Sequence, residues 1–166
     1  MLRFALVAGL VVLLVGAALF GSRFATDAQE ATPSTGSVSL VLVEHNDAMT
    51  DIDLGVTGPS PGDLRVWGPN MLADAATGED TGATTQGTCV ALAVTFDCLA
   101  TETIRFPDGS TLEIQGVQAG GGAASTRTIV GGSGRHRGAT GTVTVAPTAD
   151  LAIWTKTIVL AAPSPP

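Results

Sequence analysis

Apolar and polar residues alternate along most of the chain, and tight turns interrupt the alternation. Between residues 36 and 161 no window of ten or more residues has a clear 3.6-residue apolar period, whereas alternating and β-branched runs recur, as is typical of strands. The pattern predicts eight strands, over residues 37–45, 65–72, 87–95, 98–106, 110–118, 127–130, 142–146 and 151–160.

The connections between these strands are short, which favours antiparallel pairing. Pro107-Asp108-Gly109 is a strong hairpin signal, because proline and glycine preset the turn angles. Eight antiparallel strands can close into a barrel of lipocalin-like shape, and closure removes unpaired edges. We therefore predict an all-β fold, an eight-stranded antiparallel β-barrel, with a sandwich of two sheets as the competing architecture.

The first predicted strand is apolar on both faces. Leu40 and Leu42 lie on one face, and Val41 and Val43 lie on the other. A strand with a solvent-exposed outer face does not need these valines, so the pattern predicts burial by a neighbouring subunit and hence an oligomer.

The N-terminal region predicts export. A run of 17 apolar or glycine residues, Phe4 to Phe20, follows a single arginine and predicts a leader helix roughly 25 Å long. Small residues at Thr26 and Ala28 make cleavage after Ala28 plausible. Residues 1–28 are thus a signal peptide or an uncleaved membrane anchor, and either one makes the domain secreted or extracytoplasmic. Residues 29–36 are interpreted as a linker, 37–160 as the barrel and 161–166 as a disordered tail.

Charge and composition exclude some classes of function. The chain has 15 acidic and 8 basic residues, a formal net charge of −7, and no basic stripe, which argues against a nucleic-acid partner. Beyond the leader the aromatic residues are Trp67, Trp154, Phe96 and Phe106, so the core must be built from Val, Leu, Ile and Ala.

Acidic residues cluster after the first strand without the spacing of a metal site. Asp47, Asp51 and Asp53 do not match a calcium loop, and the chain has neither H-E-x-x-H nor C-x-x-C. We interpret this segment as a polar loop and predict no metal and no cofactor. A Ser-His-Asp catalytic set is not evident either.

A glycine-rich segment carries a family resemblance. Residues 131–141, GGSGRHRGATG, resemble the G-G-[ST]-G-x-[FY]-x-G-A-x-G segment of the allene oxide cyclase and dirigent superfamily, with His136 at the aromatic position. Gly62-Asp63, the G-x-C-V strand at 87–90, Asp108-Gly109 and Gly116 follow the family order. Physically, five glycines in eleven residues allow a sharp turn between two strands.

The resemblance implies candidate site residues. Glu44 and Asn46 share one strand face, and in allene oxide cyclases a Glu and an Asn of this strand line the pocket. Asn70 and Cys89 match a further pocket Asn and Cys, so the predicted catalytic residues are Glu44, Asn46 and Asn70, and Cys89 and Trp67 are candidate ligand-binding residues. The alternative is that Glu44 and its neighbours simply end a strand in solvent.

Two cysteines in an exported domain favour a disulfide. Cys89 and Cys98 lie nine residues apart, and a bond between them would exclude Cys89 as a free pocket thiol. A turn at Ala93-Val94 would pair them directly, whereas one centred near Phe96 would not.

Three functions remain open. The first is a cyclase-like isomerase acting on a small apolar molecule, and the second is a non-catalytic dirigent-type guide that orients such a ligand. The third is a structural surface domain whose barrel is filled by its own side chains. The resemblance also implies a homotrimer, and we expect membrane contact only through the N-terminal segment.

Overall fold

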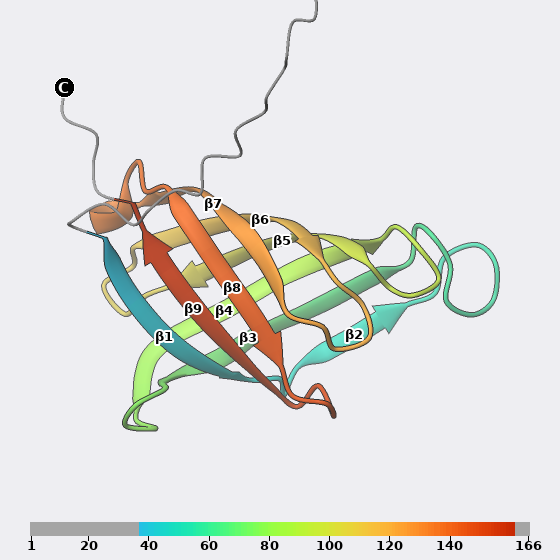
Figure 1. Ribbon diagram of the computed structural model, residues 1–166, viewed down its shortest axis with the longest axis horizontal. Coiled ribbons are helices and arrows are strands. Elements are labelled where there is room, and N and C mark those ends of the chain that lie inside the picture. The colour runs from blue at the N-terminus through green and yellow to red at the C-terminus, as the bar shows by residue number, and fades with distance from the viewer. Residues whose placement is uncertain (1–36, 162–166) are drawn as a thin grey trace, which may run out of the picture. The chain divides into compact units, whose positions relative to one another are not determined.

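The computed structural model describes residues 37–161, in which nine strands wind around one barrel (Figure 1). The strands are β1 (Val38–His45), β2 (Met49–Ile52), β3 (Leu64–Asp74), β4 (Asp80–Ala91), β5 (Cys98–Arg105), β6 (Thr111–Gln118), β7 (Ser125–Ser133), β8 (Gly141–Pro147) and β9 (Ile153–Leu160). A short 3-10 turn, η1 (Gly134–His136), precedes β8. The predicted leader, linker and tail lie outside the described residues, apart from residue 161.

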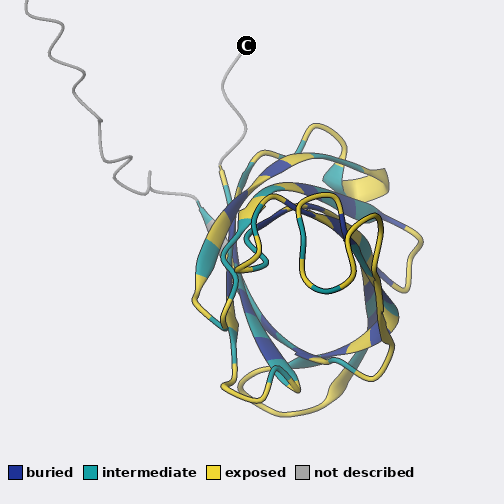
Figure 2. Ribbon diagram, turned by 90° about the vertical axis from the view of Figure 1, so that its right-hand side faces the viewer, coloured by how far each residue is buried: buried dark blue, intermediate teal, exposed yellow. Residues whose placement is uncertain are grey.

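Eight of the strands close into a ring. They are hydrogen-bonded in the order β1-β9-β8-β7-β6-β5-β4-β3, and β1 pairs with β3 to complete the circuit. Every pairing is antiparallel. The predicted eight-stranded antiparallel barrel is therefore confirmed, and the two-sheet sandwich is wrong (Figure 2). Within residues 37–161, no helix has the length and apolar character needed to cross a membrane.

The ninth strand, β2, corrects one sequence prediction. The acidic stretch interpreted as a polar loop forms β2, whose residues 49–52 pair with residues 64–67 of β3. All four β2 side chains are exposed, so no apolar alternation marked this strand. β1 pairs with residues 72–74 of β3, so β1 and β2 pair with successive parts of the same strand.

The predicted strand at 87–95 was placed too far along the chain. β4 spans 80–91, and Ala91 pairs with Cys98, which leaves residues 92–97 to form the turn. Phe96 has a positive φ of 63° in that turn, and the side chains of Leu92 and Val94 are exposed. Apolar side chains extended the strand signal past the point where the hydrogen-bonded ladder ends.

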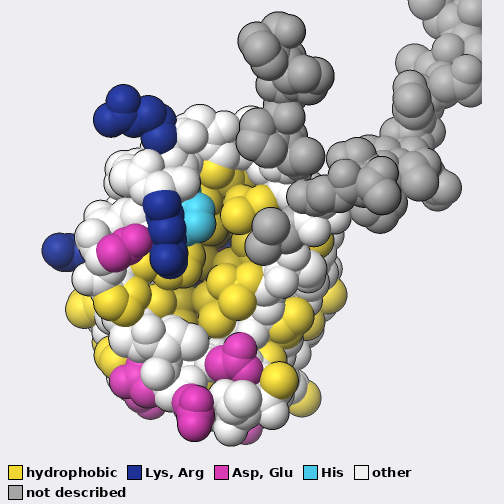
Figure 3. All heavy atoms as spheres, turned by 90° about the vertical axis from the view of Figure 1, so that its left-hand side faces the viewer, with side chains coloured by type: hydrophobic (Ala, Val, Ile, Leu, Met, Phe, Trp, Pro, Cys, Tyr) yellow, Lys and Arg dark blue, Asp and Glu magenta, His cyan; other side chains and the backbone are white. Residues whose placement is uncertain are grey.

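The barrel interior is packed with apolar side chains toward the end that carries η1. As predicted, this core is built mainly of aliphatic residues, joined by one phenylalanine and one tryptophan. Its buried members are Leu42, Leu72, Ala83, Ile104, Phe106, Leu112, Ile114, Ile129, Val143, Val145, Trp154 and Ile158. At this end apolar side chains gather around a shallow hollow on the surface (Figure 3).

The glycine-rich segment forms the turn between β7 and β8, as predicted. Gly134 and Gly138 have positive φ angles of 57° and 72°, which a residue with a Cβ rarely adopts. His136, at the family's aromatic position, packs against Phe106 with ring centroids 4.7 Å apart. Burial lowers the pKa of His136, and the nearby Arg135 lowers it further. His136 therefore has a packing role beside this turn.

Candidate functional site

A layer of buried polar side chains crosses the barrel interior beside the apolar core. Its six members come from six strands, and each is at most 3% exposed. They are Glu44 of β1, Asn70 of β3, Thr85 of β4, Glu102 of β5, Arg127 of β7 and Lys156 of β9. Two of them are acidic and two are basic, so the formal charge of the layer sums to zero.

Glu102 is the centre of this layer. Its Oε1 accepts hydrogen bonds from Thr85 Oγ1 at 2.5 Å and from Lys156 Nζ at 2.6 Å, and its Oε2 pairs with Arg127 Nη2. Burial alone would raise the pKa of Glu102, but the charges of Lys156 and Arg127 outweigh it and lower the pKa to about 2. Glu102 is therefore an ionised anchor for the two cations.

Glu44 lies on the other side of Lys156. Its Oε2 is 2.8 Å from Lys156 Nζ, and its Oε1 accepts a hydrogen bond of 2.7 Å from Asn70 Nδ2. Asn70 Oδ1 in turn accepts a hydrogen bond from the backbone N–H of Ala48, in the connection between β1 and β2. Asn70 thus fixes both the Glu44 carboxyl group and the chain that leaves β1.

A cavity lies above this layer, at the barrel end opposite η1, which faces the viewer in Figure 2. The cavity is small, about 20 Å³, which is room for about one water molecule. Glu44, Arg127 and Lys156 border it on the side of the polar layer. The other lining residues are mostly apolar or uncharged: Asn46, Met49, Arg65, Trp67, Cys89, Gln118 and Trp154. The cavity therefore has a charged floor and largely apolar walls.

Trp67 is seated in the cavity wall by a glycine on the next strand. Gly87 pairs with Trp67 across β3 and β4. A Cβ at Gly87 would lie 2.5 Å from Cζ2 of the Trp67 ring and 2.4 Å from the backbone oxygen of Thr101. Only glycine leaves room for the indole, which explains the glycine of the G-x-C-V strand.

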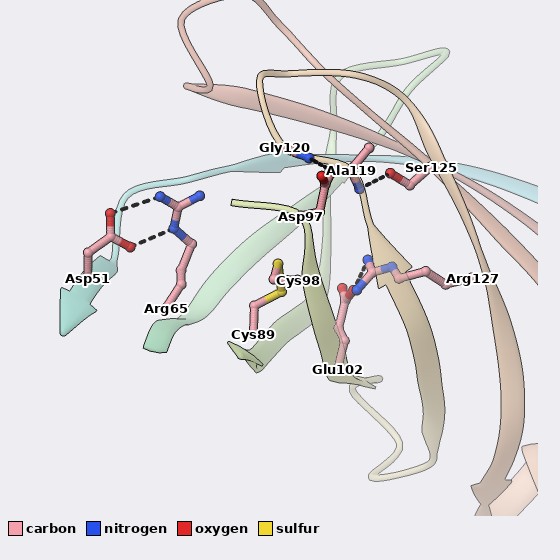
Figure 4. The surroundings of a disulfide bond; sticks show 10 residues. All are labelled: Asp51, Arg65, Cys89, Asp97, Cys98, Glu102, Ala119, Gly120, Ser125 and Arg127. Carbon is pink, nitrogen blue, oxygen red and sulfur yellow. Dashed lines mark hydrogen bonds and ion pairs between the residues drawn. A yellow bond between two sulfur atoms is a disulfide. The ribbon is translucent and has the colours of Figure 1, made fainter. Parts of the chain in front are cut away.

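A disulfide between Cys89 and Cys98 forms another part of the wall (Figure 4). Cys89 pairs with Ala100 and Cys98 pairs with Ala91, so the bond joins diagonal neighbours on the inner face, with Cα atoms 5.5 Å apart. The predicted bond is present, although the turn does not set the two cysteines directly opposite each other. Cys89 is consequently not a free thiol.

Arg65 lines the cavity close to the disulfide and is held by an ion pair. Its Nε and Nη2 donate to the two carboxylate oxygens of Asp51, at 2.6 and 2.8 Å (Figure 4). Its guanidinium also lies over the Phe96 ring, 4.4 Å from the centroid. These contacts join β2, β3 and the 92–97 turn.

The structure brings the predicted site residues together. Glu44, Asn46, Trp67 and Cys89 all line the cavity, and Asn70 holds Glu44 from behind. Asn46 is only partly buried, and its Nδ2 donates to the backbone oxygen of Leu151 at 3.3 Å. The alternative that Glu44 ends its strand in solvent is wrong, because Glu44 is 3% exposed.

Sequence reasoning missed the charged residues that accompany Glu44. Glu102, Arg127 and Lys156 were not singled out, although the sequence carried a signal for each. Glu102 alternates with Ala100 and Ile104 on the inner face of β5. Lys156 lies between Trp154 and Ile158 on the inner face of β9, whereas Arg127 on β7 has an apolar neighbour on one side only, Ile129, so its signal is weaker. A charged residue flanked at two-residue spacing by apolar residues predicts a buried charge.

Metal-ligating side chains do not cluster in the described part of the chain. Within residues 37–161 no group of three or more His, Cys, Asp or Glu side chains is arranged to hold a metal ion.

Comparisons with known proteins show the fold. No protein-family model matches the chain, and no curated protein does. A pyocyanin demethylase superposes with a TM-score of 0.63 at 22% identity, covering 75% of this chain and 100% of that one. A pterocarpan synthase dirigent protein superposes with a TM-score of 0.62 at 19% sequence identity, and the match covers 82% of this chain and 98% of that one. A Diels-Alderase from Streptomyces koyangensis superposes with a TM-score of 0.60 at 22% sequence identity, and the match covers 79% of this chain and 72% of that one. The chain therefore has the same barrel fold as dirigent and cyclase proteins.

Proposed function

We propose that the barrel binds a small apolar molecule in its cavity and guides the cyclisation or isomerisation of that molecule. The observation that carries the proposal is the cavity itself, with Trp67, Trp154 and the disulfide in its walls and Glu44 at its floor. Such a site holds an apolar ligand in one orientation while presenting charge to one part of it. Fixing the reacting geometry is by itself a large catalytic effect.

Glu44, Asn46 and Asn70 have distinct roles in this proposal. Glu44 faces the ligand and stabilises positive charge that develops during ring closure. Asn70 is a positioning residue, because it donates to Glu44 and binds the backbone of Ala48. Asn46, at the cavity rim, offers its amide to a polar group of the ligand.

The structural neighbours support a reaction of this class. A dirigent protein and a Diels-Alderase use the same barrel, and both names describe proteins that direct bond formation. Membership of the allene oxide cyclase group is a finer proposal that rests on the glycine segment and on Glu44, Asn46 and Asn70. Cys89 departs from that pattern because its sulfur is in a disulfide.

A non-catalytic, dirigent-type role is the second candidate. Both carboxylate oxygens of Glu44 are already engaged, one by Asn70 and one by Lys156. With both oxygens already engaged by groups of the protein, Glu44 has no unoccupied oxygen to take a proton from a ligand, and this arrangement favours orientation of a ligand over proton transfer. The third hypothesis, a structural domain whose barrel is filled by its own side chains, is favoured by the apolar core and by the small volume of the cavity.

The deciding experiment begins with mass spectrometry of small molecules that co-purify with the protein. The substrate identified in this way is then tested with Glu44→Gln, and Glu79→Gln serves as the control because Glu79 is exposed on a turn. We expect Glu44→Gln to lower turnover at least tenfold and Glu79→Gln to leave it unchanged. Equal turnover in all three proteins would end the catalytic claim and leave the binding role.

We also propose a homotrimer. Val90, Leu99 and Val117 are direct register neighbours across β4, β5 and β6, and their side chains are 40%, 50% and 54% exposed. This row is an apolar surface suited to contact between copies of the chain. The mass of the particle in solution, by light scattering, tests the trimer, and Leu99→Lys should shift it toward the monomer. A wild-type particle with the mass of one chain would contradict the proposal.

Export remains a proposal as well. The disulfide fits an oxidising compartment, and the predicted leader supplies the route. The N-terminal sequence of the protein recovered outside the cytoplasm would distinguish cleavage after Ala28 from an uncleaved anchor. Recovery only in the cytoplasm would contradict both.

A further inference from the structure

The barrel has an open sheet edge along β2. Among the described residues, β2 is the only strand with a neighbour on one side alone, because it pairs with β3 and with no other strand. β9 runs beside β1 up to the pair of His45 with Ile153, and it does not continue along β2 (Figure 1). The sheet is therefore closed along β1 but open along residues 49–52, at the barrel end opposite η1.

The hydrogen-bonded ladder shows which backbone groups face this open edge. Gly68 N–H donates to Ala48 O, and bonded pairs recur at every second residue of an antiparallel ladder. Thr50 is therefore bonded to β3, whereas the N–H and C=O groups of Met49 and Asp51 point away from β3. No other described segment bonds to these four groups. An extended chain can pair with such an edge through its own backbone.

Exposed apolar side chains surround the open edge. Six large ones in β2, in the loop after it and in the 92–97 turn are 38% to 76% exposed: Met49, Ile52, Leu54, Val56, Leu92 and Val94. A groove of about 320 Å³ lies beside β2, and its apolar lining is formed by Ile52, Pro59, Val94 and Phe96. Exposed residues also predominate in the loops that face the viewer in Figure 2. Apolar surface left in solvent beside an unpaired strand is typical of a site for a partner.

The charges near β2 indicate which kind of partner fits. Five aspartates lie in β2 and in the segments around it, against the single cation Arg65: Asp47, Asp51, Asp53, Asp63 and Asp97. Among the described residues, Asp51 is the only one of the five that forms an ion pair, with Arg65. A second copy of this chain would bring the same aspartates to the edge and be repelled, whereas a basic segment would be attracted.

We infer that β2 is a docking edge for an extended, basic segment of another protein, which adds a strand to the sheet. The backbone of this segment pairs with the outward groups of Met49 and Asp51. Its apolar side chains lie in the groove beside β2, and its lysine or arginine side chains lie among the aspartates. This site is on the barrel surface, and it does not depend on the function proposed for the cavity.

Two peptides of opposite charge test the inference on the protein. Acetyl-KVKVKV-amide has the alternating basic and apolar side chains of the inferred segment, and acetyl-EVEVEV-amide has the same pattern with the charge reversed. Titrations followed by nitrogen–proton NMR give the affinity for each peptide. We expect the basic peptide to bind about tenfold or more tightly than the acidic one at low salt, and this preference to shrink as salt is added.

Hydrogen exchange of backbone amides distinguishes strand addition from contact through side chains alone. The N–H groups of Met49 and Asp51 should exchange freely in the protein without peptide, because they have no acceptor. Saturation with acetyl-KVKVKV-amide should slow their exchange about tenfold or more, since both become bonded to the added strand. The N–H group of Thr50 is already bonded to β3 and should change less.

Variants at one position separate the backbone from the side chain. Met49→Pro removes an outward N–H group and leaves the bonds to β3 in place, because proline is tolerated at the first residue of a strand. Affinity for the basic peptide should fall about tenfold in Met49→Pro. Met49→Ala loses the same side chain but keeps the N–H group, so its affinity should stay within about threefold of the wild type.

A second pair of variants tests the charge. Asp47→Asn combined with Asp53→Asn removes two exposed charges near the edge, and affinity for the basic peptide should fall about fivefold. Glu79→Gln combined with Asp80→Asn makes the same change in net charge at the turn between β3 and β4, and it should leave the affinity within about twofold.

Each other outcome would overturn the inference. Equal binding of the two peptides would show that charge does not select the partner. Binding of the basic peptide without protection of Met49 and Asp51 would show a surface contact and no added strand. Protection of these amides without peptide, rising with protein concentration, would show that the edge pairs with a second copy. Absence of binding by the basic peptide would remove the docking edge and leave the proposed function of the cavity untouched.

Discussion

Replacing Glu102 with glutamine tests the physical role of the buried polar layer. Glutamine keeps the size and shape of the side chain but removes the charge that Arg127 and Lys156 share. Lys156 keeps Glu44 as a partner, whereas Arg127 loses the only ion-pair partner it has among the described residues. Glu102→Gln therefore leaves a buried guanidinium without a compensating charge.

Two lines of reasoning give a similar size for the destabilisation caused by Glu102→Gln. The lowering of the Glu102 pKa from 4.5 to about 2 corresponds to roughly 3 kcal/mol of preference for the ionised form in the folded protein. Removing one partner of a buried ion pair typically costs about 3–5 kcal/mol. We expect Glu102→Gln to lower the free energy of unfolding by about 3–5 kcal/mol at pH 7, measured by urea titration with tryptophan emission and an intact disulfide.

The pH dependence gives the same experiment a second readout. A carboxyl group whose pKa is lowered by folding stabilises the fold above its unfolded pKa, and this contribution is lost as the pH falls from about 4.5 toward 2. The stability difference between the wild type and Glu102→Gln should therefore be constant above about pH 5 and shrink below it. Other carboxyl groups cancel in this difference because both proteins contain them.

Asp51→Asn is the matched control, because it breaks an ion pair at the surface. The side chain of Asp51 is 52% exposed, and such pairs contribute about 0–1 kcal/mol. If Glu102→Gln is no more destabilising than Asp51→Asn, or if its effect does not shrink in acid, the layer is not the buried ionic network described above.

Two further predictions concern the cavity wall. Replacing both Cys89 and Cys98 with serine should lower the free energy of unfolding by roughly 3 kcal/mol in a urea titration, because the unfolded chain is then no longer restricted by a short closed loop. An unchanged midpoint and slope of the titration would contradict this. Gly87→Ala should destabilise the protein by about 2 kcal/mol or more in the same assay and alter tryptophan emission, because its Cβ meets Trp67 and a backbone oxygen. Gly131→Ala, where a Cβ meets nothing within 4 Å, should change stability by less than about 0.5 kcal/mol, and equal effects of the two would refute the packing argument.

The fold could be predicted because each strand carries its own local signal. Alternation marks the inner face, and turn residues such as Pro107-Asp108-Gly109 mark the ends. The strand predictions were wrong where the polarity of the side chains does not follow the hydrogen bonding of the backbone. β2 is paired through its backbone while its side chains remain exposed, and Leu92 and Val94 are apolar residues in a turn. The sequence pattern cannot distinguish a paired strand with exposed side chains from a turn with apolar side chains, because backbone hydrogen bonds do not depend on side-chain polarity.

The site could be predicted only in part, for a different reason. Glu44, Asn46 and Asn70 were accessible through the family resemblance. The two charged partners of Glu102 are 25 and 54 residues away along the chain, so their interaction depends on the barrel being closed. Each charged residue alone looks like an ordinary surface residue, and only its two-residue spacing from apolar neighbours indicates the inner face.

The position of the charged layer argues that it serves the cavity more than the stability of the barrel. Buried ion pairs rarely stabilise a protein more than well-packed apolar residues of similar volume, and the other half of this barrel is filled with such residues. Glu102 is satisfied by three partners, whereas two donors of Arg127 have no partner. A network built for stability alone would satisfy its own donors. Three members of the layer, Glu44, Arg127 and Lys156, border the cavity, which is why we assign the layer to the site.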